Sequence, residues 1–442
     1  MASSSSYAAI VLTGLLLDHA LRVLSSLLTL RALRPAPPPE FRKLFDADRY
    51  RRSQAYTRAR TGFGMIASTA QLLAVLAFWG AGGFGWLDRT VRAAGLGRVA
   101  TGLLFIAALG LARALVGLPF ALWSTFVIEE RFGFNRTSGA TFVADRAKGL
   151  LLVIVLGGPL LAGVLWLFET AGASAWLWAW GVSAVAVVGI QFVVPAWIMP
   201  LFSRFTPLAP GHLRDAILDY GRAVGFPLAD VYVVDGSRRS TRANAFFTGF
   251  GRQRRIGLFD TLLATLDAGA IVAVVAHEVG HWKRGHVLQG VALGVLHVGA
   301  LFLLLRFVLG QPALFAAFGI AQPSPYAGLV LLGLLLAPVE LVFSILLHAW
   351  SRRNEREADG FAVATTADGP ALARGLRRLS VDGLANLTPH PLTVLLDYSH
   401  PPVLERVRAL DPNAGMHAGV HSDAGPHGEA RLPSPSSTSA DV

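Results

Sequence analysis

Apolar runs long enough to cross a lipid bilayer constrain the fold of this chain more than any other feature. A helix needs about 20 mostly apolar residues to cross about 30 Å of hydrocarbon. Such runs occur at residues 7–30, 64–86, 99–128, 149–171, 174–200, 287–310 and 326–350. Only 15% of the 442 residues are charged, whereas about a quarter are charged in soluble domains. The sequence therefore predicts a mainly α, polytopic membrane protein with seven transmembrane helices.

The basic residues are distributed by loop, and this indicates how the spans are oriented. Arginines are frequent between the first two runs, in the segment 201–286 and after residue 350, whereas the short loops near 172 and at 311–325 have none. Cytoplasmic loops carry the excess of Lys and Arg, so the pattern predicts an external N-terminus and a cytoplasmic C-terminus. The first run lacks a basic n-region and a cleavage site, and we expect it to be a retained span. The net charge of +11 thus reflects topology and not nucleic-acid binding.

The segment Ala276–His281 contains the motif HExxH, which points to a specific chemistry. On a helix, His277 and His281 lie on one face and can present two imidazoles to the same ion. Glu278 is then placed to take a proton from a metal-bound water, as in zinc hydrolases. The chain has no cysteine, so histidines and carboxylates must hold any metal. The alternative is a buried amphipathic helix whose histidines only pack or form hydrogen bonds.

A catalytic zinc needs a third protein ligand and one open position. His286 lies about 140° around the helix from His281, so we expect it to support the site and not to bind the ion. The best third ligand is Glu355, and Asp359 one turn later can accept a hydrogen bond from a ligand histidine. Glu357 is a rival ligand. The other interpretation of residues 351–359 is an ordinary charged helix face at a membrane boundary. The two motif helices continue adjacent spans, which would hold one ion at the cytoplasmic face of the membrane.

The chain divides by composition into three parts. Residues 1–205 are predicted to form a five-helix transmembrane domain, and residues 206–411 a second domain that carries the zinc motifs together with spans six and seven. Within the latter, Val231–Val234, Asn244–Thr248 and Ile256–Phe259 are apolar stretches typical of short strands. Residues 412–442 lack periodicity and are predicted to be a disordered tail.

The seventh run carries a polar stripe, because Glu340, Ser344 and His348 lie four residues apart. Ionisable residues inside spans usually face a bundle interior or a watery cavity. The stripe therefore indicates either hydrogen bonding between helices or a hydrated chamber behind the site.

Taken together, the motifs resemble those of the integral-membrane zinc metalloproteases of the type I CAAX prenyl protease family. The resemblance covers roughly residues 30–410 and five motifs in order. They are Ile128–Thr137 with Asp145 and Lys148, Asn244–Gly249 with Leu258–Leu263, His277–Lys283, Ser351–Asp359, and Tyr398–Pro402 with Arg406. The family fold is a seven-helix barrel around a water-filled chamber, with a gluzincin-like zinc metalloprotease domain and a small β-sheet on the cytoplasmic side.

The resemblance also implies roles for individual residues. It implies His277, His281 and Glu355 as ligands of one Zn²⁺ per chain, and Glu278 as catalytic base. It implies that the edge strand through Asn244, Ala245 and Phe246 pairs with the substrate backbone. His400 and Arg406 would lie near the zinc, to stabilise an oxyanion or bind the substrate C-terminus. From the residues alone, His400 can equally be a turn residue, and Arg406 can pair with Glu405 or a neighbouring helix.

The predicted function is metal-assisted hydrolysis of peptide bonds by an integral membrane enzyme. The expected partners are a peptide or protein substrate, prenylated or not, and the lipid bilayer, with no nucleic acid. Removal of the last three residues of a prenylated C-terminus is the first interpretation. A bacterial quality-control protease of the same chemistry is the second, since the preference for Arg over Lys hints at a GC-rich bacterial source. A non-catalytic scaffold is the third, and an intact Glu278 argues against it.

Overall fold

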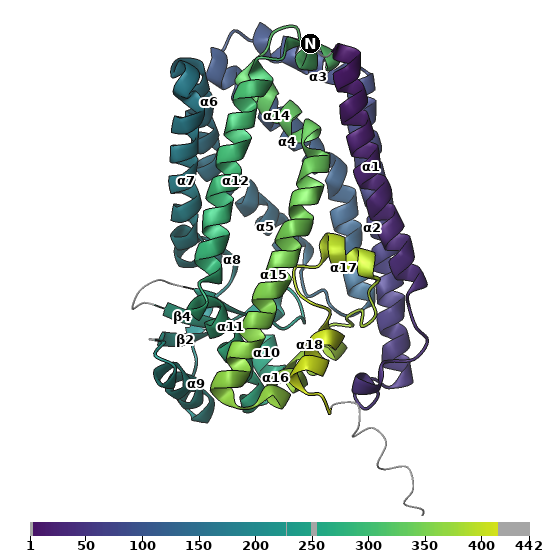
Figure 1. The fold of residues 1–442 in the computed structure, drawn as a ribbon, viewed down its shortest axis with the longest axis vertical. Helices are drawn as coiled ribbons and strands as arrows, with labels where there is room; N and C mark the ends of the chain where they lie inside the picture. Colours follow the sequence, from purple (N-terminus) through teal and green to yellow (C-terminus); the bar gives the residue numbers. More distant parts are fainter. Residues whose placement is uncertain (1–2, 227, 249–253, 414–442) are drawn as a thin grey trace, which may run out of the picture.

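The computed structural model describes residues 3–226, 228–248 and 254–413, and it confirms a mainly helical membrane protein (Figure 1). Within these residues, six helical stretches are long and apolar enough to cross a membrane, and a bent helix pair supplies a seventh. Three stretches are single helices: α1 (Ser4–Arg31), α2 (Ala47–Gly80) and α12 (His286–Leu309). The other three contain π-helical turns. One consists of α4 (Arg98–Trp123) and η2 (Ser124–Glu129), and the next of α5 (Gly139–Leu152), η3 (Val153–Gly157) and α6 (Gly158–Thr170). The last consists of α7 (Ala175–Val193), η5 (Val194–Ile198) and α8 (Met199–Phe202).

The seventh predicted span is bent where hydropathy predicts one straight helix. α14 (Pro325–Leu335) and α15 (Ala337–Thr366) meet at Leu336 at an angle of 62°. Pro338 stands in the first turn of α15, where it has no N–H to donate and its ring excludes the carbonyl four residues earlier. The proline therefore accounts for the break, and α15 continues well beyond residue 350 to carry the second metal motif.

The spans stand as a ring, with α7 beside α12, α15 in front, and α1 beside α2 (Figure 1). In the most apolar part of each of the six unbent spans at most 22% of the residues are buried, and in α2 none is. A solid bundle would bury the inward face of every helix, so these helices surround a chamber. Of the polar stripe, Glu340 makes a contact between helices, at 3.4 Å from His297 of α12, whereas Ser344 bonds within α15 to Leu341 O at 2.8 Å.

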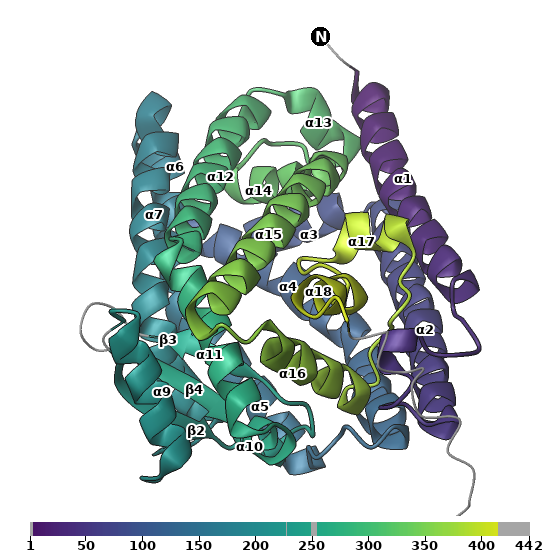
Figure 2. The same cartoon turned by 60° about the horizontal axis from the view of Figure 1, so that its bottom comes forward.

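One end of the ring is closed by packed aromatic side chains. α3 (Gly83–Ala93), α13 (Pro312–Ala317) and α14 lie across this end (Figure 2). Trp79 of α2 stacks on Phe318 at 4.4 Å, and Phe84 meets the same ring edge-on at 5.3 Å. The indole N–H of Trp79 donates to Ala317 O at 2.9 Å. These contacts fix the second span to the connection between the sixth and seventh spans.

The opposite end carries a four-stranded sheet of order β1-β2-β4-β3, with β2 and β4 parallel and the other pairs antiparallel. The strands are β1 (Phe205–Pro207), β2 (Leu228–Val234), β3 (Ala245–Thr248) and β4 (Arg254–Phe259). The three predicted strands match β2, β3 and β4, and β1 was not predicted because three residues give no alternation to read. β3 lies at the end of the sheet, as predicted for the substrate strand.

Five further helices belong to this half of the chain near the sheet: α9 (His212–Ala223), α10 (Asp260–Thr265), α11 (Ala268–Lys283), α16 (Gly369–Asp382) and α18 (Val403–Leu410). A sixth, α17 (Pro391–Asp397), packs against α15 and α1. The core of the sheet and the five helices includes Ile217, Val231, Leu258, Ile271 and Leu372, each at most 2% exposed. The predicted domain boundary between residues 205 and 206 falls inside β1. The predicted disordered tail lies outside the described residues from position 414 onward.

Candidate active site

The first metal motif lies on α11, a helix with a defined start and end. Asp267 accepts a hydrogen bond from the backbone N–H of Ala270 at 2.8 Å, which caps the N-terminus. After Lys283 the chain turns through Gly285, whose φ of +71° favours glycine, and α12 begins at the next residue. The motif therefore sits in the last turns of a buried helix that leads directly into a membrane span.

Gly280 allows α11 and α15 to come together at the site. A Cβ at this position would lie 3.1 Å from both the Cα and the carbonyl oxygen of Ala358. Backbone atoms cannot yield as a side-chain end can, so only glycine permits this approach. The fourth residue of the HExxH motif is thus explained by helix packing, and Figure 2 shows the two helices crossing at this level.

The three side chains predicted as metal ligands, His277, His281 and Glu355, converge between these helices, where they could hold a metal ion. His277 Nε2 lies 3.2 Å from His281 Nε2. The carboxylate oxygens of Glu355 lie 3.4 Å from His277 Nε2 and 3.3 Å from His281 Nε2. Ligand atoms bound tetrahedrally to zinc at about 2.0–2.1 Å stand about 3.3 Å apart. The side chain of Glu355 is 6% exposed, and its Oε2 has no hydrogen-bond partner among the described residues. The donor set therefore fits one Zn²⁺ ion.

Asp359 lies beside the first histidine, where it can accept a hydrogen bond from the ring. Its Oδ1 lies 2.8 Å from His277 Nδ1, which leaves Nε2 facing the other two ligands. Arg406 donates to both oxygens of Asp359, at 2.8 and 2.6 Å, and its Nη1 lies 3.3 Å from Glu355 Oε2. The side chain of Arg406 is only 10% exposed. These contacts place Arg406 behind the ligands, where it holds two carboxylates.

His281 is oriented by a longer chain of contacts. His286 Nδ1 lies 3.0 Å from His281 Nδ1, and His286 Nε2 lies 3.3 Å from Glu357 Oε2. Arg353 donates to the other oxygen of Glu357 at 2.9 Å. If His281 binds metal through Nε2, its Nδ1 carries the proton and donates to His286, which in turn donates to Glu357. Glu357 therefore supports the site from outside, and the structure does not bring it to the ligands as a rival.

His400 lies on the open side of the ligand cluster. Its Nε2 is 3.2 Å from Glu355 Oε1, and 63% of its side chain is exposed. Ser399 Oγ lies 2.9 Å from His400 Nδ1, which fixes the ring. The imidazole is thus close to the ligands and still accessible to a substrate.

A cleft of about 350 Å³ lies between α11, α15 and the sheet. It is lined by Glu278, His281, Phe246, Phe247, Trp282, His286, Val287, Trp350, Ser351 and Asn354. Burial raises the pKa of Glu278, and the two ligand histidines offset part of that effect. A carboxylate whose pKa is raised toward neutrality is better suited to act as a general base.

The predicted substrate strand forms one wall of this cleft. Ala245 pairs with Leu258 of β4, and the other edge of β3 faces away from the sheet. Asn244, just before the strand, is exposed, and its side chain accepts from the N–H of Ala245 at 2.9 Å. An extended peptide can add to such an edge through main-chain hydrogen bonds.

Three cleft residues on α15, Trp350, Ser351 and Asn354, were not predicted. Ser351 and Asn354 stand four residues and one residue before Glu355. Because Ser351 and Glu355 are four residues apart, helical spacing could have placed both side chains on the same face of α15. No such signal identifies Trp350, whose position in the cleft depends on how α15 packs against α11 and the sheet.

Replacing His286 with Ala is expected to weaken Zn²⁺ binding about 10–100-fold, because partners that orient a ligand histidine have effects of this size. Competition with a chelator of known affinity measures the change. His297, which contacts Glu340 far along α12, provides the control, and His297→Ala should leave the affinity unchanged. Equal affinity in the His286 variant and the parent protein would contradict the role assigned to the chain of contacts.

Zn²⁺ affinity is expected to rise with pH up to about 9. Burial lowers the pKa of His277, but the hydrogen bonds to Asp359 and Glu355 together outweigh this effect. They raise the pKa to about 9 in the metal-free site. Below that pH a proton must leave before the imidazole can bind metal, so affinity should increase by up to about tenfold per pH unit. Asp359→Asn should flatten this dependence above neutral pH. A parent protein whose affinity does not change between pH 6.5 and 8.5 would contradict the prediction.

Comparisons with known proteins cover nearly the whole chain. Residues 26–204 match the family model described as "CAAX prenyl protease N-terminal, five membrane helices", and residues 207–414 match "Peptidase family M48". The chain is 32% identical to the rice CAAX prenyl protease 1 homolog, over 86% of this chain and 92% of that one. It is 31% identical to the human homolog (84% and 88%) and 32% identical to CAAX prenyl protease 1 of Saccharomyces cerevisiae (85% and 88%). The crystal structure of S. mikatae Ste24p superposes with a TM-score of 0.87 at 29% identity, covering 92% of this chain and 99% of that one.

Proposed function

Because the chain belongs to the CAAX prenyl protease family of M48 metallopeptidases, we propose that it binds one Zn²⁺ through His277, His281 and Glu355 and cleaves prenylated proteins near their C-termini. The protein is a multi-pass membrane metalloprotease. The observation that carries the proposal for the site is the tetrahedral spacing of the three ligand atoms beside a cleft that contains Glu278 and an open strand edge.

The residues of the chain divide the reaction among them. Bound Zn²⁺ would supply a water of lowered pKa and polarise the scissile carbonyl. The edge of β3 holds the substrate backbone in the cleft, and Glu278 takes the proton of the attacking water and returns it to the departing amine. His400, accessible beside Glu355, donates its Nε2–H to the charge that develops on the carbonyl oxygen. Arg406 keeps Asp359 and Glu355 in place during these steps.

The substrate class rests on the relatives and on the lining of the cleft. A fungal relative is named CAAX prenyl protease 1, and plant and animal relatives are named homologs of it. Phe246, Phe247, Trp282 and Trp350 give the cleft an apolar wall suited to aliphatic side chains. The comparisons do not favour the quality-control interpretation, and a bacterial source stays a prediction from composition because these relatives are eukaryotic.

Cleavage of three substrates by the purified protein tests this proposal. We expect a farnesylated CAAX peptide to be cut before its last three residues, and its unprenylated twin and an unfolded protein to be cut much more slowly. Cleavage that ignores the lipid would favour a general membrane protease. Bound zinc without cleavage of any of the three substrates would contradict the proposed protease activity.

The cytoplasmic position of the site can be tested because the chain has no cysteine. Ser174 and Asp215 are exposed at opposite ends of the ring. A membrane-impermeant thiol reagent should label Ser174→Cys in intact cells and Asp215→Cys only after permeabilisation. The reverse pattern would place the cleft outside.

A further inference from the structure

The loop 128–137 begins in the last turn of η2; it belongs to the membrane-spanning half but packs against the segment leading into β3. Its Arg136 N–H donates to Arg239 O at 3.0 Å, and the N–H of Thr241 donates to Phe134 O at 3.2 Å. An antiparallel β-bridge lies between these two bonds. The segment before β3 is therefore paired with the membrane-spanning half.

Two arginines of the same segment bind acids on the transmembrane helices. Arg239 donates to both oxygens of Asp145 on α5, at 2.8 and 3.0 Å. Arg242 donates to Glu129, the last residue of η2, at 3.2 Å, and to the hydroxyl of Tyr56 on α2. Two parallel N–H···O bonds to one carboxylate fix orientation as well as distance. The two side chains thus fasten the start of β3 to three helices.

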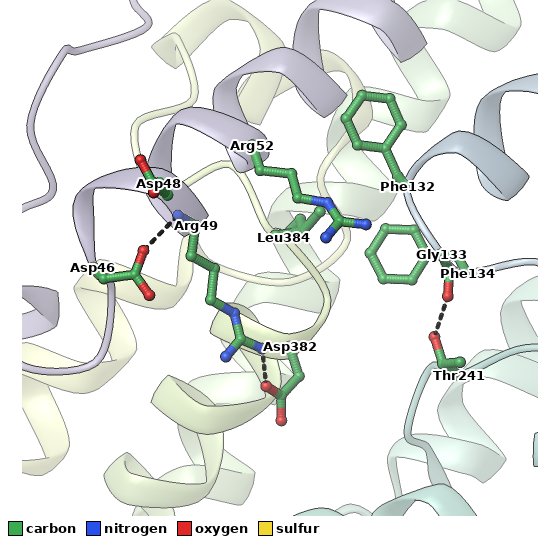
Figure 3. Close-up of a pocket in the computed structure, with 10 residues that line it drawn as sticks. All are labelled: Asp46, Asp48, Arg49, Arg52, Phe132, Gly133, Phe134, Thr241, Asp382 and Leu384. Carbon is green, nitrogen blue, oxygen red and sulfur yellow. Dashed lines mark hydrogen bonds and ion pairs between the residues drawn. The ribbon is translucent and has the colours of Figure 1, made fainter.

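The loop itself is firmly held. Tyr56, Phe132 and Phe134 are at most 6% exposed, and the Tyr56 ring lies 5.0 and 5.1 Å from the two phenylalanine rings. Gly133 between the phenylalanines has φ of +75°, which lets both rings reach this core. Figure 3 shows Thr241 bonded to Gly133 O, at 3.3 Å, beside a cavity of about 500 Å³. The loop is a rigid base for the segment before β3.

The side of β3 that faces α11 is held by aromatic packing. Phe247 meets Phe226 at 5.3 Å between ring centroids, and Phe226 meets Trp282 at 5.1 Å. Trp282 follows the ligand His281 directly in the sequence. The distance between β3 and the metal ligands is thus set by α11 on one side and by the membrane-spanning loop on the other.

We propose that the loop 128–137 and its two ion pairs are a positioning element that places β3 at the correct distance from the metal ligands for substrate to bind. Arg239 and Arg242 are positioning residues, since they touch neither the metal ligands nor the cleft. This inference rests on the proposed function, in which β3 binds substrate. It gives a role to the motif Ile128–Thr137, which takes no part in the proposed chemistry at the metal ligands.

Kinetics of the full-length protein test the proposal, with cleavage of one peptide measured for each variant. Arg239→Gln should raise KM about fivefold or more and change kcat less than about twofold, since binding and not chemistry is disturbed. The exchange of Asp145→Arg with Arg239→Asp should restore KM. Arg214→Gln is the matched control, because the ion pair of Arg214 with Asp230 has similar exposure (28% and 25%, against 24% and 25% for Arg239 and Asp145) and joins α9 to β2 instead of to a membrane helix.

Hydrogen exchange of the same variants supplies a readout that needs no cleavage. Arg239→Gln should speed exchange in residues 239–248 and leave α11 unchanged, while Arg214→Gln should leave residues 239–248 as in the parent protein. An unchanged KM, an equal KM increase in the Arg214 variant, or unchanged exchange in residues 239–248 would each overturn the inference. If the parent protein holds zinc and cleaves nothing, the proposed function fails, and exchange still decides whether the loop positions β3.

Discussion

Replacing Glu278 with Gln is expected to lower kcat about 10²–10⁴-fold while the zinc content stays unchanged, because positioned general bases contribute rate factors of this size. Gln keeps the shape of the side chain and cannot take a proton from water. Glu278 lines the cleft and is not one of the three converging ligands, so the metal site itself should remain intact. Steady-state cleavage of the farnesylated peptide and metal analysis of the same sample measure both quantities.

Glu357→Gln is the matched control for this experiment. Glu357 lies on α15 close to the site and contacts His286 and Arg353, but it is not among the residues that line the cleft. At saturating Zn²⁺ this variant should keep most of its kcat, although its metal affinity should fall. A Glu278→Gln protein that retains full activity would remove the base from the mechanism, and one that loses its zinc would make it a ligand.

Replacing Glu355 with Gln is expected to abolish both zinc retention and cleavage. The neutral amide is a poor metal ligand, and the buried carboxylate at this position contacts both His277 and His281. Its removal would leave only two protein ligands, fewer than a catalytic zinc requires. Metal content after dialysis and residual cleavage measure the loss.

Glu340→Gln is the control on the same helix. Glu340 lies near the other end of α15 and pairs with His297, so its zinc content should equal that of the parent protein. The parent protein treated with a chelator should also lose activity and recover it on addition of Zn²⁺. Full zinc content in the Glu355 variant would mean that another group completes the site.

Hydropathy and helical spacing predicted most of this architecture because they are local properties. Long apolar runs need no tertiary information, and the one error in the spans is the bend at Pro338, whose effect a window average hides. Similarly, His277 and His281 lie on one face by helical geometry alone. The sequence favours Glu355 because Asp359 stands one turn later and because the two motif helices continue adjacent spans.

The arginine pairs that support the site could not be predicted in this way, because each joins distant parts of the chain. The pair of Arg239 and Asp145 spans 94 positions, and that of Arg406 and Asp359 spans 47. Spacing offers no rule for such pairs. For Arg406 the residues alone left a neighbouring helix as a partner, and the structure supplies it: Asp359 on α15.

The open edge of β3 has a consequence for which proteins such an enzyme can cleave. A strand edge offers its N–H and C=O groups to any extended backbone, whatever its side chains. A helix or a paired strand has already used those groups internally. The first requirement for cleavage would therefore be local disorder. The enzyme would bind an unstructured terminal segment and would leave a folded domain in the same membrane intact.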